Sequence, residues 1–153
     1  MKILNFLSMK DNPIILVDDD IDDVSMIKEA IAILGLKNDI LVFQTGQKAY
    51  DFISDMKDIP FFILCDINMP EMDGIELRQK IYENEALKAK AIPFIFMTTA
   101  GNAGHIHRAY NLSVQGYFIK PNRFETLVQM IKSISDYWKN CQHPNSVSVI
   151  AKV

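Results

Sequence analysis

The sequence predicts an α/β domain: a five-stranded parallel sheet with five helices on both faces, in a doubly wound arrangement. Three observations predict this fold class. Short β-rich runs alternate with segments of helical apolar spacing, which is typical of parallel strands joined by right-handed crossovers. The runs lack polar alternation, as expected for strands that are covered on both faces. The chain of 153 residues is also about the size of one domain and is long enough to bury a core.

Five short runs rich in β-branched and aromatic residues predict the strands, namely 14–17, 40–43, 61–65, 92–97 and 115–119. Segments with helical spacing lie between them. Within 24–34 apolar residues recur every three or four positions, and Gly35 follows where a helix would end. A shorter stripe within 49–56 and a longer one within 124–138 have the same spacing. Strands and helices therefore alternate along the chain.

Residues 13–140 are expected to form this single domain. No internal repeat or change of composition divides the chain before about residue 140. Residues 1–12 are predicted to be an N-terminal extension, and residues 141–153 a C-terminal tail.

Composition and charge exclude several other classes of protein. The chain has 49% hydrophobic and 23% charged residues, which argues against extended disorder. A formal net charge of -3 disfavours direct binding of nucleic acid. No apolar run approaches the roughly 18 residues of a membrane span, so we expect no membrane partner. Two cysteines without a disulfide or metal-ligand pattern favour a reducing compartment, and we expect a cytoplasmic protein.

Polar residues follow the carboxyl ends of the expected strands, where ligands bind in an open parallel sheet. In chain order these residues are Asp18, Asp19, Asp20, Asp22, Asp23, Asp66, Asn68, Thr98, Thr99 and Lys120. Because the carboxyl ends of parallel strands meet at one edge, we expect acids, a hydroxyl and one ammonium group to share a crevice there.

The residue types in this crevice indicate phosphoryl chemistry. Carboxylates that lie close together repel one another and need a cation, and hard oxygen ligands with open positions favour Mg2+. Lysine is a compact charge that suits a phosphoryl oxygen. No glycine-rich phosphate loop follows the first strand, so we expect no bound nucleotide as the donor. Asp66, at the end of the central strand, is best placed to act as a nucleophile and form an aspartyl phosphate.

Four motifs in this order resemble those of bacterial two-component receiver domains, of the single-domain, chemotaxis-Y-like type. They are VDDD at 17–20, DINMPEMDG at 66–74, MTT at 97–99 and GYFIKP at 116–121. The resemblance covers about residues 13–140 and implies the flavodoxin-like (βα)5 fold. It implies a response regulator that accepts a phosphoryl group from a sensor histidine kinase or phosphotransfer protein, rather than a metabolic enzyme.

The resemblance also implies a role for each matching residue. Asp66 matches the phosphoacceptor, and Mg2+ is implied to be held by Asp18, Asp19, Asp66 and the backbone carbonyl of Asn68. Lys120 matches the lysine that contacts the phosphoryl group, and a cis peptide is implied before Pro121. Thr98 matches the switch residue that carries a hydroxyl, and Tyr117 matches the aromatic switch residue.

The partners are implied in the same way. Receiver domains contact their downstream proteins through the fourth helix, the fifth strand and the fifth helix. In this sequence the corresponding residues are 105–110, Tyr117 and the exposed side of 123–138. A homodimer is compatible with the resemblance.

Some alternatives stay open at this point. Asp20, Asp22 and Asp23 are explained at least as well as acids that cap a helix and favour its dipole. A hydrolase that forms an aspartyl phosphate is one alternative function, although such enzymes need a second aspartate where Asn68 stands. An interaction module that works without phosphorylation is another, and the complete set of site residues argues against it.

Overall fold

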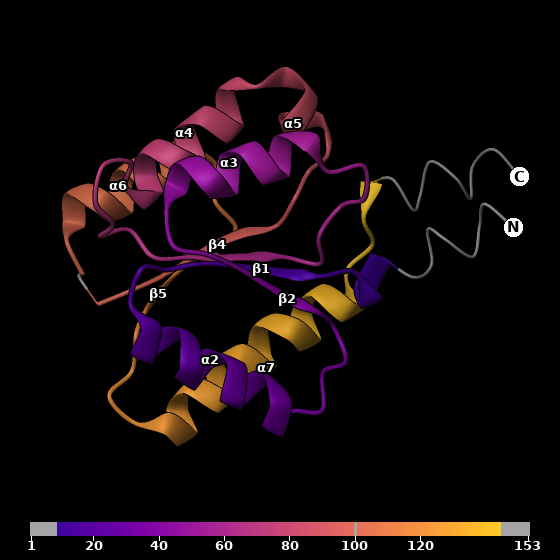
Figure 1. The fold of residues 1–153 in the computed structure, drawn as a ribbon, viewed down its shortest axis with the longest axis vertical. Helices are drawn as coiled ribbons and strands as arrows, with labels where there is room; N and C mark the ends of the chain where they lie inside the picture. Colours follow the sequence, from indigo (N-terminus) through magenta and orange to yellow (C-terminus); the bar gives the residue numbers. More distant parts are fainter. Residues whose placement is uncertain (1–8, 100, 145–153) are drawn as a thin grey trace, which may run out of the picture.

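The computed structural model describes residues 9–99 and 101–144 (Figure 1). A 3₁₀ helix, η1 (Met9–Asp11), takes the first place in the helix numbering. The strands are β1 (Ile14–Val17), β2 (Ile40–Phe43), β3 (Ile63–Cys65), β4 (Phe94–Thr98) and β5 (Gly116–Ile119). The helices are α2 (Ile21–Ile33), α3 (Gly46–Asp55), α4 (Gly74–Glu83), α5 (Glu85–Ala89), α6 (Ala103–Asn111) and α7 (Phe124–Asn140).

The five strands form one parallel sheet in the order β2-β1-β3-β4-β5. Helices α2 and α7 cover one face, and α3, α4, α5 and α6 lie on the other (Figure 1). The predicted fold class is therefore confirmed. The order of the strands makes β3 the central strand, with β1 and β4 as its neighbours, so that residues after these strands come together at one edge.

The core is divided by the sheet into two clusters. Side chains alternate between the faces of a strand, so Ile15 and Val17 of β1 pack toward α3 and α4, whereas Ile14 and Leu16 pack toward α2 and α7. All four are buried, as expected for a strand that is covered on both faces. Strands β3 and β4 are buried over their full length in the same way.

The helix count differs from the prediction, because the crossover between β3 and β4 carries two helices instead of one. Asn84 has extended backbone angles (φ -86°, ψ 107°) and so ends α4. Its side chain then accepts a hydrogen bond from the backbone N–H of Leu87 and caps α5. The expected five helices are therefore wrong by one within the described residues, where there are six α-helices.

Three strands begin later than the sequence predicts: β5 by one residue, and β3 and β4 by two residues each. Phe61 and Phe62 are buried but precede β3, and the Phe61 N–H donates to the carbonyl of Pro13 at 2.9 Å. The expected strand at 92–97 begins at Phe94, directly after Pro93, which has no N–H to donate. An apolar run in the sequence predicts which residues are buried. Which of these residues form the strand depends on the hydrogen bonds that their backbone makes.

Both predicted terminal segments extend outside the described residues. Of the extension 1–12, only residues 9–12 are described, and Asn38 Nδ2 donates to the carbonyls of Lys10 (2.7 Å) and Asn12 (2.8 Å). Of the tail 141–153, only residues 141–144 are described. In the described part of the chain, no helix has both the length and the apolar character needed to cross a membrane.

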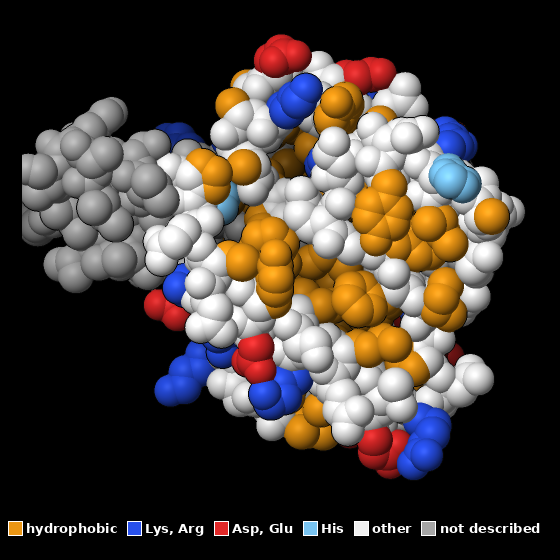
Figure 2. All heavy atoms as spheres, turned by 180° about the vertical axis from the view of Figure 1, so that it is seen from behind, with side chains coloured by type: hydrophobic (Ala, Val, Ile, Leu, Met, Phe, Trp, Pro, Cys, Tyr) orange, Lys and Arg blue, Asp and Glu red, His pale blue; other side chains and the backbone are white. Residues whose placement is uncertain are grey.

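One face of the molecule exposes apolar side chains. Tyr110 of α6, Ile119 of β5 and Tyr137 of α7 are 55%, 42% and 62% exposed. Figure 2, which views the molecule from behind, shows hydrophobic side chains gathered across the middle of a face with few charged groups among them. We call the surface of α6, β5 and α7 the β5-edge face.

Candidate functional site

The candidate site lies at the carboxyl ends of the sheet strands. Val17 of β1 is paired with Cys65 of β3, so the next residues, Asp18 and Asp66, leave the sheet side by side. In the same way Thr98 of β4 is paired with Ile119 of β5, and the N–H of Lys120 donates to the carbonyl of Thr98 at 2.8 Å. The parallel register thus brings together residues that are up to 102 positions apart in sequence.

Three carboxylates form the acidic part of the site. Asp18, Asp19 and Asp66 each offer a carboxylate oxygen, and these oxygens all lie within 4.8 Å of one another. Asp18 and Asp66 are buried, whereas Asp19 is exposed. Clustered oxygen donors that are open to solvent on one side fit a hard divalent cation, whose charge would offset their repulsion. Asn68, in the loop after β3, is exposed.

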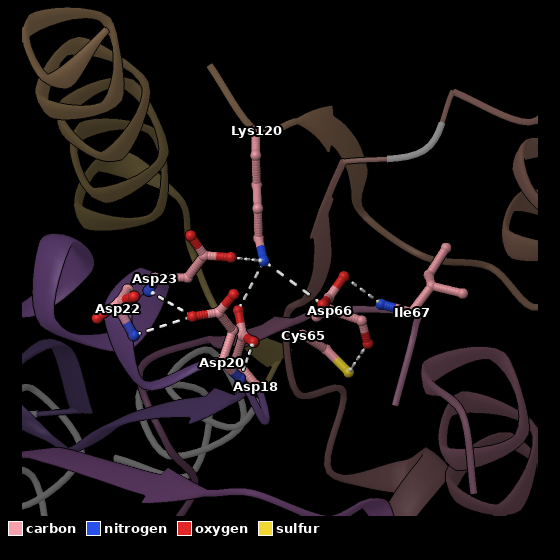
Figure 3. A network of polar contacts seen from close by, with 8 residues as sticks. All are labelled: Asp18, Asp20, Asp22, Asp23, Cys65, Asp66, Ile67 and Lys120. Atoms are coloured by element: carbon pink, nitrogen blue, oxygen red, sulfur yellow. Dashed lines mark hydrogen bonds and ion pairs between the residues drawn. The ribbon is translucent and has the colours of Figure 1, made fainter. Parts of the chain in front are cut away.

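The Lys120 ammonium lies among the carboxylates. Its Nζ is 2.7 Å from Asp23 Oδ2, 2.8 Å from Asp18 Oδ2 and 3.4 Å from Asp66 Oδ2 (Figure 3). Burial alone would lower the pKa of Lys120, but the hydrogen bonds with Asp18 and Asp23 outweigh it and raise the pKa above its ordinary value. Lys120 is therefore a permanent positive charge in the site.

Asp18 has the opposite balance. Its burial raises the pKa of its carboxyl group above the ordinary value, and the hydrogen bond from Lys120 offsets this only in part. Its other oxygen, Oδ1, accepts a hydrogen bond from the backbone N–H of Asp20 at 2.9 Å. A cation beside Asp18 would therefore favour the charged form of a carboxyl group that burial disfavours.

The backbone orients Asp66. Its Oδ1 accepts a hydrogen bond from the N–H of Ile67 at 2.8 Å, which leaves Oδ2 on the side of Lys120. The following loop turns back sharply, and the N–H of Gly74 donates to the carbonyl of Ile67 at 2.9 Å. A Cβ atom on Gly74 would lie 2.2 Å from the carbonyl oxygen of Asp66, so only glycine fits at the start of α4.

Thr98 and Tyr117 lie on the neighbouring strands. The Thr98 side chain is fully buried, and its hydroxyl has no hydrogen-bond partner among the described residues. Buried hydroxyls are normally paired, so this one calls for an explanation. Tyr117 is half-buried, and its ring packs 6.0 Å from that of Phe96. Burial, with a smaller contribution from the charge of Asp66, raises the pKa of Tyr117.

The acids after Asp19 have different roles. Asp20 caps α2, since its side chain accepts hydrogen bonds from the N–H groups of Asp22 (2.9 Å) and Asp23 (3.2 Å). The capping interpretation is thus confirmed for Asp20. Asp22 is exposed, whereas Asp23 is paired with Lys120. The Asp23–Lys120 pair was not predicted from the sequence. The position of Asp23 in the first turn of α2, close to the end of β1, was a signal for it.

One expectation from the resemblance is wrong. No cis peptide bond occurs among the described residues, so the bond before Pro121 is trans. Trans is favoured by about 0.5–1 kcal/mol for bonds before proline, which allows either form.

Comparison with known proteins agrees with this geometry. Residues 14–132 match the model of the response regulator receiver domain family. The probable methanogenesis regulatory protein FilR2 of Methanothrix harundinacea is 32% identical over 129 residues, which cover 82% of this chain and 82% of that protein.

Two solved structures are similar over most of both chains. The phosphorylated cyanobacterial phytochrome response regulator RcpA superposes with a TM-score of 0.77 and 28% identity, covering 86% of this chain and 97% of that one. The Mn2+-bound form of response regulator Rcp1 gives a TM-score of 0.75 and 27% identity, with the same coverage.

Proposed function

Because the chain belongs to the response regulator receiver domains, we propose that Asp66 is its phosphoacceptor. The observation that carries the proposal is the place of Asp66 Oδ2, which is 3.4 Å from Lys120 Nζ and belongs to a cluster of three carboxylates. Receiver domains interact with histidine kinases and with downstream proteins. Incubation with acetyl phosphate, followed by measurement of the intact mass, tests whether the chain takes up one phosphoryl group.

The chemistry requires little from the protein besides position and charge. Asp66 Oδ2 forms a bond to phosphorus while the phosphorus–nitrogen bond of a phosphohistidine donor breaks, and the electron pair leaves with the imidazole nitrogen. Lys120 places a fixed positive charge beside the group that is transferred. The reactions are self-catalysed phosphotransfer and autodephosphorylation, so we propose a signalling switch rather than a metabolic enzyme.

The cation proposed for the site is Mg2+, held by the side chains of Asp18, Asp19 and Asp66 and by the backbone carbonyl of Asn68. The bound ion would neutralise charge on the phosphoryl oxygens. The clustering of hard oxygen donors supports this assignment.

Asp19→Asn is expected to weaken Mg2+ binding by about tenfold or more, because a charged ligand becomes neutral. A Mg2+ titration followed by amide NMR signals near the site measures the change. Asp22→Asn is the matched control: it removes the same charge from an exposed residue nearby, and it should bind Mg2+ almost as the wild type does. Equal losses in the two variants would mean that the ion does not use Asp19.

We propose the β5-edge face as the surface for the downstream partner. Its exposed apolar side chains on α6, β5 and α7 support this, since contiguous exposed apolar surface commonly marks a protein interaction site. Tyr117, on the same strand as Ile119, lies between this face and Phe96. The same face could pair with a second copy of the chain, which sedimentation of the phosphorylated protein would detect.

Beryllofluoride, which mimics the phosphoryl group, is expected to shift the amide NMR signals of α6 and β5 as well as those of the site. The reason is that Thr98 and Tyr117 connect the site to these elements. Helix α3, which follows β2 at the opposite edge of the sheet from β5, serves as the internal control and should change least. Shifts confined to the residues around Asp66 would contradict a role for the β5-edge face.

The alternatives have less support. A hydrolase with an aspartyl phosphate would need an acid two residues after the nucleophile, and the chain has Asn68 there. We also infer that the protein acts in the cytoplasm, where kinases have ATP. The two cysteines, Cys65 and Cys141, are free thiols, which is consistent with a reducing compartment.

A further inference from the structure

We propose that Asp23 is a positioning residue that holds Lys120 back from Asp66 and has to release it when a phosphoryl group is bound. This role rests on the proposed phosphorylation of Asp66. It adds a restraint, carried by the first turn of α2, that lowers the affinity of the site for the phosphoryl group.

The distances around the Lys120 ammonium support this role. Nζ is 2.7 Å from Asp23 Oδ2 but 3.4 Å from Asp66 Oδ2, so the contact with the phosphoacceptor is the longer one. In Figure 3 the Asp23 and Asp66 carboxylates lie on opposite sides of the ammonium group. Movement of Nζ toward Asp66 therefore lengthens its bond with Asp23.

The local structure keeps Asp23 in place. Its backbone lies in the first turn of α2, where its N–H donates to Asp20 Oδ1 at 3.2 Å. Its side chain is 31% exposed and that of Lys120 only 9%, so solvent screens the pair less than it screens a surface ion pair. The pair is consequently strong enough to compete for the ammonium group.

Phosphorylation changes the balance of charges around Lys120. A phosphoryl group on Asp66 carries a charge of about -1.5 to -2 and offers acceptor oxygens, so it attracts Nζ more strongly than the carboxylate does. The negative charge of Asp23 repels the same group. Asp23 therefore opposes the binding of the phosphoryl group in two ways. It keeps Nζ away from the phosphoryl oxygens, and its own negative charge repels them.

The surroundings leave room for this rearrangement. Asp23 and Lys120 border an open pocket of about 250 Å³. The pocket is also lined by Met26, Thr99 and Pro121, among others. Because this side of the pair is not filled by protein atoms, the two side chains can separate without disturbing the core.

The test is a beryllofluoride titration of the full chain in Mg2+, with Asp23→Asn and Asp22→Asn compared by amide NMR. Both variants remove one negative charge from the first turn of α2, but only Asp23 contacts Lys120. We expect Asp23→Asn to bind beryllofluoride about three- to tenfold more tightly than the wild type, because this variant loses a partly buried ion pair. Asp22→Asn should remain close to the wild type.

A second measurement observes the position of Lys120 without any ligand. The NMR signal of the Lys120 side-chain ammonium should shift in Asp23→Asn and stay in place in Asp22→Asn. Since an asparagine oxygen can still accept a hydrogen bond from lysine, Asp23→Ala repeats both measurements with that contact removed.

If both Asp23 variants bind beryllofluoride no more tightly than Asp22→Asn does, the role of Asp23 is overturned and the proposed function still stands. A wild-type chain that fails to bind beryllofluoride and also fails to take up phosphoryl from acetyl phosphate would overturn the proposed function, and with it this role of Asp23.

Discussion

Asp66→Asn should abolish the increase in intact mass that the wild-type chain shows with acetyl phosphate and Mg2+. An amide oxygen is a much weaker nucleophile than a carboxylate oxygen, so the bond to phosphorus does not form. The substitution keeps the shape of the side chain and the acceptor for the N–H of Ile67. The fold should therefore survive, and only the chemistry should be lost.

The matched control is Asp22→Asn, which is exposed and should be labelled at the wild-type rate. Hydroxylamine should remove the label from the wild-type protein, since it cleaves an acyl phosphate but not a phosphate ester. Labelling of Asp66→Asn at the wild-type rate, or a label that resists hydroxylamine, would place the phosphoryl group on another residue.

Thr98→Ala should still be phosphorylated but should lose most of the conformational response. Lys120 and a bound cation can each contact one phosphoryl oxygen, and the third oxygen needs a donor. The buried hydroxyl of Thr98, which has no partner among the described residues, is such a donor on the adjacent strand. A charge-assisted hydrogen bond contributes about 1.5–3 kcal/mol, enough to shift a two-state balance by about tenfold to a hundredfold.

The response is measured as the amide NMR shifts of the β5-edge face in each phosphorylated or beryllofluoride-bound variant. Thr98→Ser keeps the hydroxyl and should restore most of the response. Thr99→Ala changes an exposed residue beside it and should leave the response intact. A Thr98→Ala protein in which α6 and Tyr117 shift as in the wild type would refute the coupling.

Much of the fold and of the site could be predicted because both depend on local patterns. Apolar runs without polar alternation indicate covered strands, and their alternation with helical spacing requires parallel pairing. In a parallel sheet the residues after the strands meet at one edge. That rule was sufficient to bring Asp18, Asp66 and Lys120 together before any distance was known.

The structure differs from the predictions made from the sequence where the outcome depends on backbone conformation and hydrogen bonding. The extended conformation of Asn84, which separates α4 from α5, depends on how the crossover packs on the sheet. The start of β3 at Ile63 depends on which neighbours accept and donate hydrogen bonds. Neither can be read from apolar spacing, because a buried residue outside a strand has the same hydropathy as one inside it.

The sequence by itself determined which chemical groups reach the site, and only the tertiary structure decided how they are paired. Asp22 and Asp23 are identical neighbours in the sequence, yet Asp23 contacts Lys120 and Asp22 is exposed. Successive residues of a helix point about 100° apart, so only one of the two faces Lys120 at the end of β5. Whether the Thr98 hydroxyl is paired likewise depends on all the side chains packed around it, and among the described residues it has no partner. The positions of the strands and helices follow from local patterns, whereas hydrogen bonds between distant segments depend on distances of a few tenths of an ångström.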